Sequence, residues 1–196
     1  MQEQVLEKLI ETNNGILQVC EASKLGISAP TVYKFAKTHG LKRLSKGVYG
    51  DPNRWNDEMW LVSIRWPRAV FSHHSALYIH ALTDREPDAL TVTVPSGYNA
   101  STLRASDARA FYIKPKLLEM GKTVVTTPDG HNVPCYDLER TMCDIIRSRA
   151  AFDPQCFHSA LQSYARRGDK QLGLLSSYAD RLGVQGTVTH YLEVLL

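Results

Sequence analysis

The segment from Ser28 to Gly40 constrains the fold most, because it combines a strong helix start with two chemically different faces. Ser28 is a good N-cap, and Pro30 falls in the first turn, where its missing amide hydrogen costs nothing. Val32, Phe35, Ala36 and His39 share one face of the expected helix, Thr31, Lys34, Lys37 and Thr38 share another, and Tyr33 lies near the boundary. The pattern predicts a helix from about Ala29 that packs on one side and is free to contact a partner on the other.

The flanking residues predict a small domain around this helix. Apolar spacing indicates a first helix over residues 3–13 and a second, short helix from Leu17 to Leu25 that ends at Gly26. Residues 41–50 are typical of two short strands around a Ser45-Lys46-Gly47 turn. This order is that of a winged helix-turn-helix, in which the third helix enters the DNA major groove, and we assign it to residues 1–52.

The charge distribution favours the same interpretation. Between Ala22 and Gly50 the chain carries no acidic residue, whereas the first helix carries Glu3, Glu7 and Glu11. The overall formal net charge of +3 decides nothing by itself. A basic surface confined to one side of a small domain is typical of contact with phosphate, and the alternative is a solvated lysine face without a partner.

The candidate DNA-binding residues follow from these positions. Thr31, Tyr33, Lys34 and Lys37 are the candidates for contacts with base edges or the groove, and Lys42, Arg43 and Lys46 for contacts with phosphate or the minor groove. The complete candidate set is Ser28, Thr31, Tyr33, Lys34, Lys37, Lys42, Arg43 and Lys46.

Residues 53–196 predict a second, mixed domain. A helix capped by Asn56 or Asp57 stops before Pro67, and Ser72 is expected to cap another that reaches Leu82. Strands are predicted over 89–94, 110–113, 123–127 and 132–136, and helices over 137–149, 154–166, 170–182 and 188–196. The fold class is therefore α+β, with a small, mostly antiparallel sheet followed by a helical carboxyl end.

Several classes of protein are disfavoured. No apolar run approaches the roughly 20 residues of a membrane span, and the amino terminus lacks the features of a secretory signal, so we expect a cytoplasmic protein. The four cysteines form no C-x-x-C pair. His73, His74, His80 and Asp84 suggest a metal site, but their spacing does not place them on one helical face. No catalytic or phosphate-cradling motif is present, and we expect no enzyme, catalytic residue, metal or cofactor.

The segment from Tyr136 to Arg147 is the most conspicuous of the second domain. Leu138, Met142, Ile145 and Ile146 form an apolar stripe, and Arg140, Asp144 and Arg147 share another face. This face is either a surface ladder of ion pairs, worth a few tenths of a kcal/mol per pair, or a charged surface that recognises a protein partner.

Three stretches resemble the AbiEi family, the antitoxins of type IV toxin-antitoxin systems that provide abortive infection against phage. They are Ser72–Arg85, Thr91–Pro95 with Tyr98-Asn99, and Tyr136–Arg147, whose Glu139-Arg140-Thr141 and Cys143-Asp144 are the specific part. The resemblance, which covers nearly the whole chain, implies that the amino-terminal domain binds inverted repeats in its own promoter and represses the operon. It also implies an antitoxin domain over 53–196, acting against an AbiEii-like nucleotidyltransferase toxin without requiring a stable complex.

Two alternatives keep the DNA-binding domain and change the second one. It could sense a small molecule, which requires a concave pocket such as one near Trp60, His74 and Tyr78. It could also be an enzyme acting on nucleic acid or on a toxin-modified product, with His74, Asp84, Glu86 and Asp144 as the candidate residues.

Overall fold

A computed structural model describes residues 2–53, 57–104, 106 and 108–195. The chain is mixed α+β and divides into two compact units, unit 1 (residues 1–61) and unit 2 (residues 62–196). Helix α4 (Glu58–Arg65) spans this division, and the boundary expected after residue 52 falls inside unit 1. Among the described residues, no helix has the length and apolar character needed to cross a bilayer.

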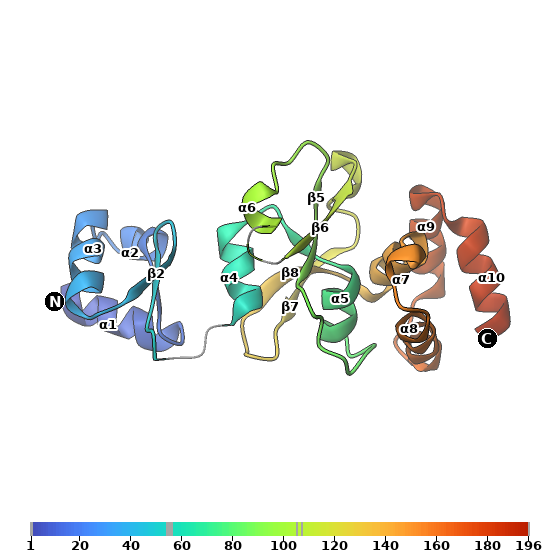
Figure 1. Ribbon diagram of the computed structural model, residues 1–196, viewed down its shortest axis with the longest axis horizontal. Helices are drawn as coiled ribbons and strands as arrows, with labels where there is room; N and C mark the ends of the chain where they lie inside the picture. The colour runs from blue at the N-terminus through green and yellow to red at the C-terminus, as the bar shows by residue number, and fades with distance from the viewer. Residues whose placement is uncertain (1, 54–56, 105, 107, 196) are drawn as a thin grey trace. The chain divides into compact units, whose positions relative to one another are not determined.

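Unit 1 consists of three helices and a three-stranded sheet (Figure 1). In chain order these are α1 (Gln2–Thr12), β1 (Ile16–Gln18), α2 (Val19–Lys24), α3 (Ala29–Thr38), β2 (Lys42–Ser45) and β3 (Val48–Gly50). The antiparallel sheet has the order β1-β3-β2. Leu6, Leu17, Ala22, Val32 and Phe35 belong to the buried core that joins the helices to the sheet.

The predicted elements of unit 1 are confirmed except at the second helix. The sequence predicts a helix from Leu17 to Leu25, but Ile16–Gln18 is a strand and α2 begins only at Val19. The cause is tertiary: Ile16 and Leu17 are buried, and they lie opposite Gly50 and Tyr49 of β3 in the sheet. Pairing with a strand more than thirty residues away overrides a weak local helix signal.

Unit 2 contains a five-stranded sheet with the order β6-β5-β4-β8-β7. Its strands are β4 (Val70–Phe71), β5 (Thr91–Pro95), β6 (Arg109–Ile113), β7 (Lys122–Thr126) and β8 (Asn132–Tyr136). The expectation of a mostly antiparallel sheet is wrong, because β5 pairs parallel with β6 and β4 pairs parallel with β8. The chain between β5 and β6 includes helix α6 (Ser101–Arg104), and a connection of this length lets β6 return in the same direction.

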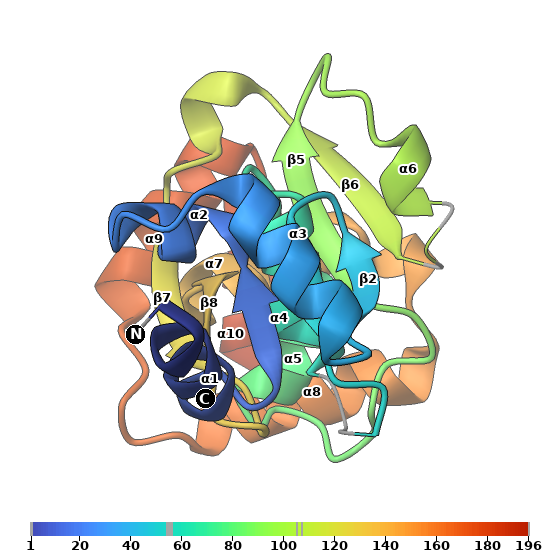
Figure 2. The same cartoon turned by 90° about the vertical axis from the view of Figure 1, so that its left-hand side faces the viewer.

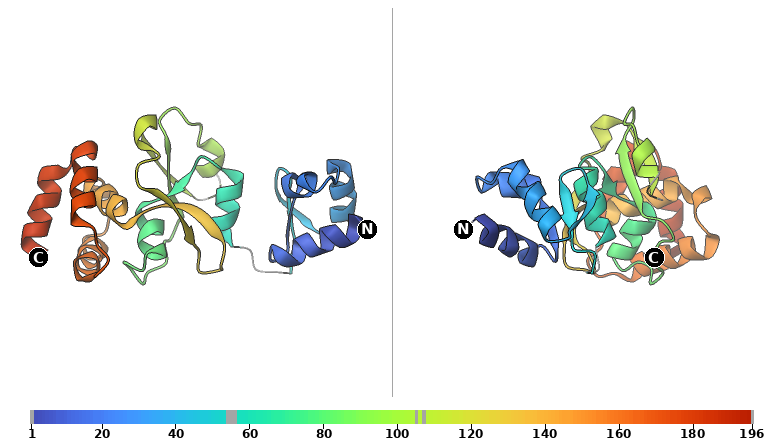
Figure 3. Two further views of the ribbon diagram at one scale, coloured as in Figure 1. Left: turned by 180° about the vertical axis from the view of Figure 1, so that it is seen from behind. Right: turned by 60° about the vertical axis from the view of Figure 1, so that its left-hand side comes forward.

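The helices of unit 2 lie mainly on one side of its sheet (Figures 1 and 3). They are α5 (His73–Ile79), α7 (Leu138–Arg147), α8 (Pro154–Arg166), α9 (Leu172–Leu182) and α10 (Gln185–Leu195), with short 3-10 turns at Pro115–Leu117 and Arg149–Ala151. Helix α5 packs against both β5 and α7, and α7 packs against α9. The largest buried core joins α5 and α7 to α8, α9 and α10, so α7 is the central helix of the unit.

Hydrogen bonds show how the predicted N-cap residues of α4 and α5 are used. Asp57 accepts a bond from Trp60 N at 2.9 Å and so caps α4, while the alternative, Asn56, lies outside the described residues. Ser72 occupies the N-cap position of α5 as expected, but its side chain makes no capping hydrogen bond. Its hydroxyl instead contacts His73 Nδ1 at 2.9 Å and accepts from Thr93 Oγ1 at 2.8 Å, which ties the start of α5 to the sheet.

Candidate nucleic-acid interface

Helix α3 begins where the sequence predicts, and its first turn is closed by hydroxyl groups. Ser28 has an extended backbone and accepts a hydrogen bond from Thr31 N at 3.4 Å, and its hydroxyl lies 2.9 Å from Thr31 Oγ1. Pro30 occupies the first turn. Gly26 precedes this start at a positive φ of 79°, which permits the tight turn between α2 and α3. The helix is therefore held rigidly from its first residue.

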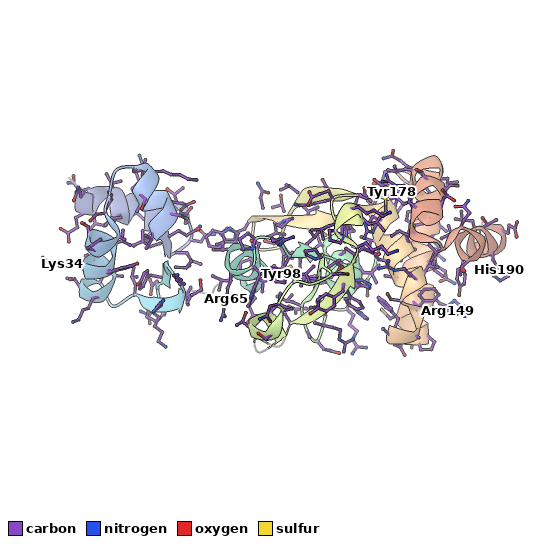
Figure 4. All side chains as sticks on the ribbon, turned by 90° about the horizontal axis from the view of Figure 1, so that it is seen from above. Lys34, Arg65, Tyr98, Arg149, Tyr178 and His190 are labelled. Carbon is purple, nitrogen blue, oxygen red and sulfur yellow. The ribbon has the colours of Figure 1, made fainter. Side chains whose placement is uncertain are left out.

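The outward side of α3 carries exposed cations. Val32, Phe35 and Ala36 are buried, whereas Lys34 and Lys37 are exposed. Figure 4 shows Lys34 extending outward from the helix. Neither lysine forms an ion pair within the described part of the chain, so no carboxylate of that part neutralises their charges.

The hairpin of β2 and β3 adds a second group of cations. Lys42 and Arg43 are on β2 and Lys46 is in the turn, and all three are exposed. Gly47, at a φ of 74°, supplies the left-handed residue of the turn, and the pairing shifts between Arg43 and Ser45. Arg43 Nε donates to Ser45 O at 3.3 Å, and in the described residues these cations also have no carboxylate partner.

The two sides of α3 differ in their surroundings. On one side, a groove lies between α3 and the acidic helix α1, lined among others by Glu3, Thr31 and Lys34. On the other side, Tyr33 contacts Tyr49 of β3, with ring centroids 6.0 Å apart and planes tilted by 55°. Figure 2 shows α3 in front, with β2 beside it. Lys34 thus shares a groove with Glu3 of α1, whereas Tyr33 lies on the side of α3 that faces β3.

The predicted interface residues all lie on these elements, but they are not equivalent. Ser28, Thr31, Tyr33, Lys34 and Lys37 are at or on α3, and Lys42, Arg43 and Lys46 are on the hairpin. Thr31 is half-buried, and its hydroxyl is hydrogen-bonded to that of Ser28. Thr31 is therefore a weaker candidate for contact with a base. Sequence reasoning missed Tyr49, although its position on a short strand beside Arg43 could have identified it as a neighbour of the surface.

The charged face predicted on α7 is not a surface. Arg140 and Asp144 have no exposed side-chain area, and their Nε and Oδ2 atoms lie 3.0 Å apart. Both sequence interpretations of Arg140 and Asp144, a surface ladder and a recognition surface, are therefore wrong for this pair. Arg147 is the partly exposed member, with 28% of its side chain exposed and its Nη2 3.3 Å from Asp144 Oδ1. The cause is position: α7 packs against α5, α9 and α10.

Arg140 is held by groups from several elements. Its Nη1 donates to Leu117 O at 3.0 Å and to Met120 O at 2.7 Å, and its guanidinium stacks 4.0 Å from the centre of the Tyr136 ring. The ring face lies against the guanidinium, whose Nη2 has no hydrogen-bond acceptor among the described residues. Burial raises the pKa of Asp144, and the Arg140 and Arg147 charges oppose that rise. This arrangement links α7 to the turn before β7.

The histidines at the start of α5 have separate surroundings. His73 is fully buried, stacks on Phe111 at 3.5 Å between ring centroids, and contacts Ser148 Oγ through Nε2 at 3.2 Å. Burial and then the Arg147 charge hold the pKa of His73 well below its usual range. His74 stacks on Phe152 at 4.0 Å, and the His73 ring also lies 6.2 Å from that of Phe152. Within the described residues, no group of three or more His, Cys, Asp or Glu side chains could hold a metal ion.

One polar cavity of about 230 Å³ lies in unit 2, beside His74. His74, Arg85, Glu86, Asp88, Arg109 and Asp153 are among its lining residues, whereas Trp60 and Tyr78 are not. Burial and the Arg109 charge lower the pKa of His74, which favours the neutral imidazole. Of the candidate enzyme residues, the cavity therefore brings together only His74 and Glu86, and Asp144 is buried elsewhere.

Comparison with known proteins identifies the fold and no family. No protein-family model matches the chain, and no curated protein matches it. Among solved structures, the crystal structure of the RV2827C protein from Mycobacterium tuberculosis is similar, with a TM-score of 0.60 and 14% sequence identity. The similarity covers 90% of this chain and 70% of that chain. At this identity the likeness concerns the fold alone, and any function must be argued from the residues.

Proposed function

We propose that residues 1–52 are a winged helix-turn-helix DNA-binding domain and that the chain represses its own promoter. The observation that carries the proposal is the cluster of exposed cations on α3 and the β2–β3 hairpin, none of which pairs with a carboxylate among the described residues. Elsewhere among the described residues exposed cations do pair, as Arg85 does with Asp88 and Lys122 with Glu119. A local excess of unneutralised charge is what a polyanionic duplex would bind.

In this proposal α3 enters the major groove and the hairpin contacts the flanking backbone. A helix of the dimensions of α3 fits the major groove, where Lys34 and Lys37 can reach phosphates and base edges. Lys42, Arg43 and Lys46 follow the backbone or the adjacent minor groove. Of the acidic residues of α1, Glu3 lines the groove beside Lys34, on the side of α3 away from Tyr33 and Tyr49.

We further propose that residues 53–196 are the antitoxin domain of a type IV toxin-antitoxin system. The resemblance of Ser72–Arg85, Thr91–Pro95 and Tyr136–Arg147 to the AbiEi family supports this assignment. The functional partner is then an AbiEii-like nucleotidyltransferase toxin, and the proposal requires neither catalysis nor a cofactor in this chain. Within the Arg140, Asp144 and Arg147 set, only Arg147 offers surface to a partner, and the other two support the fold of the domain.

The experiment is promoter binding by charge-reversal variants of the full chain. The interface variant changes Lys34, Lys37, Lys42, Arg43 and Lys46 to Glu, and the control changes the exposed Lys8, Lys114, Lys116, Arg166 and Arg181 to Glu. Both variants undergo the same change in net charge, so a general loss of positive charge cannot separate them. We expect the interface variant to lose retardation of a promoter fragment, with an unchanged circular dichroism spectrum, and the control to retain most of it. Equal binding by the wild type and the interface variant would refute the proposal.

The antitoxin assignment has an independent test in cells. If neutralisation resides in residues 53–196, the interface variant should still relieve growth arrest caused by the cognate toxin when both are expressed from foreign promoters. Failure of the folded wild-type chain to relieve that arrest would contradict the antitoxin assignment, while leaving DNA binding unaffected.

A second candidate function for residues 53–196 is the sensing of a small molecule, favoured by the cavity beside His74. The cavity is lined by charges of both signs, whereas most small-molecule sites are largely apolar, and we rank this function second for that reason. A ligand that occupied it would change promoter affinity in the wild type, and Arg109→Ala would remove the response without changing affinity in the absence of the ligand. No response of promoter binding to cellular metabolite fractions would exclude it.

A further inference from the structure

The exposed side of α3 is divided into two rows with different chemistry. Thr31, Lys34 and Thr38 follow one another at helical spacing, and Tyr33 and Lys37 form the second row, four residues apart. The first row lines the groove toward α1 together with Glu3. The second row begins at Tyr33, which contacts β3 of the basic hairpin through Tyr49. The second row is therefore the one that lies beside the hairpin cations.

The hydroxyl groups of the first row already have hydrogen-bond partners inside the protein. Thr31 Oγ1 lies 2.9 Å from Ser28 Oγ, and Thr38 Oγ1 donates to Lys34 O at 3.0 Å. A base edge would have to compete with these local bonds. The lysines of both rows are compact point charges on flexible stems, and such groups contact phosphate with little dependence on base sequence.

Tyr33 differs from all of these residues. It is 48% exposed, and no hydrogen bond engages its hydroxyl within the described residues. Its ring is oriented by Tyr49, which lies between Leu17 of β1 and Arg43 of β2 in the sheet register. A tyrosine ring restrained in this way offers an apolar face and one polar group at low entropic cost.

We propose that Tyr33 reads base sequence in the major groove and that Tyr49 is the positioning residue that orients it. The ring is suited to the methyl group of thymine and the hydroxyl to acceptors or donors on base edges. Lys34, Lys37 and the hairpin cations then supply affinity without selecting a sequence. This inference rests on the proposed function and adds the residue that distinguishes the operator from other DNA.

The experiment compares dissociation constants for the promoter fragment and for a shuffled duplex of the same length and composition, at one salt concentration. Tyr33→Ala should reduce the preference for the promoter by about tenfold or more and leave binding to the shuffled duplex unchanged, as expected when a base contact is lost. Lys37→Ala is the contrasting variant, because it should weaken binding to both duplexes equally. Thr38→Ala, on the same helix, is the control and should change neither constant.

The role of Tyr49 is tested by a double-mutant cycle. Tyr49→Leu should reduce the preference in the same direction as Tyr33→Ala, and the double variant should be no worse than Tyr33→Ala alone, because Tyr49 acts only through Tyr33. Thermal unfolding of each variant checks that unit 1 remains folded at the assay temperature.

Separate results would overturn the role of Tyr33, the role of Tyr49 and the proposed function. The inference is wrong if Tyr33→Ala leaves the preference intact, or if it weakens both duplexes equally. The role assigned to Tyr49 is wrong if the effects of Tyr33→Ala and Tyr49→Leu add. If the wild type binds neither duplex, the proposed function itself fails, and the inference fails with it.

Discussion

Arg140 Nε lies 3.0 Å from Asp144 Oδ2, one turn away on α7, and neither side chain has exposed surface. An ion pair in this position adds little net stability, because the desolvation of both charges offsets much of their attraction. Arg140 also donates hydrogen bonds to Leu117 O and Met120 O, and these bonds hold the segment before β7 against α7. The Tyr136–Arg147 segment thus holds β7 and α7 of unit 2 together.

Removal of one partner leaves the other charge buried without the compensation of its partner, so the effects of the two removals should not add. Arg140→Met leaves the Asp144 carboxylate buried with Arg147 as its remaining ionic partner, and we expect a loss of about 3–5 kcal/mol in the free energy of unfolding. The Arg140→Met/Asp144→Leu double variant should lose less than the sum of the single variants. Urea unfolding measures both quantities, and additive losses would contradict the coupling.

Gly121 should tolerate no side chain, because it supports Arg140. An added Cβ would lie 2.5 Å from Arg140 Cβ, and the backbone φ of 74° already disfavours other residues. We expect Gly121→Ala to lower the free energy of unfolding by about 2–4 kcal/mol, the sum of backbone strain and overpacking. Gly173→Ala, on α9 with open space around the added Cβ, should instead be stabilising by about 0.5–1 kcal/mol. Similar effects of the two substitutions on the denaturation midpoint would be inconsistent with this geometry.

His73 should make unit 2 less stable in mild acid. Its pKa is held well below the ordinary value of 6.5 in the folded chain, so below that pH the unfolded chain binds a proton that the folded chain does not. Stability therefore falls as the pH drops below 6.5, by up to about 1.4 kcal/mol per pH unit from this group. His73→Asn removes the titration and suits the positive φ of 52°, so it should flatten the dependence.

The matched control for this dependence is His190→Asn. His190 is exposed on α10 of the same unit, so its replacement controls for the substitution of a histidine as such. Urea midpoints at about pH 5 and pH 7.5 are measured for the wild type, His73→Asn and His190→Asn. One titrating group changes the free energy of unfolding by at most about 1.4 kcal/mol per pH unit. A wild-type slope that persists in His73→Asn would assign the acid sensitivity to another group.

The elements with strong local signals were predictable from sequence. The Ser28 cap and Pro30 place the start of α3, and the strands predicted over 123–127 and 132–136 match β7 and β8 to within a residue. The carboxyl-terminal helices were also predictable, because each carries a sustained apolar stripe. The surface of candidate DNA contacts followed from these elements, since an exposed helix face and a hairpin are local features.

The features that depend on distant partners were not predictable. Strand β4 has only Val70 and Phe71, too short for a periodic signal, although it is the centre of the sheet. The burial of Arg140 could not be inferred, because charged residues at helical spacing usually face solvent. Whether Arg140 is buried or faces solvent depends on the packing of α7 against other helices, and the local sequence pattern does not encode that packing.

The central claim is that the cations of α3 and the hairpin contact DNA phosphates, and the salt dependence of binding tests it most directly. If about four to six phosphates are neutralised, the logarithm of the association constant for the promoter fragment should fall against the logarithm of salt concentration with a slope of about −4 to −5. The interface variant should show no measurable binding across the same range, and Lys37→Ala should reduce the slope by about one. A wild-type slope near zero, or one unchanged by reversing these cations, would contradict the account.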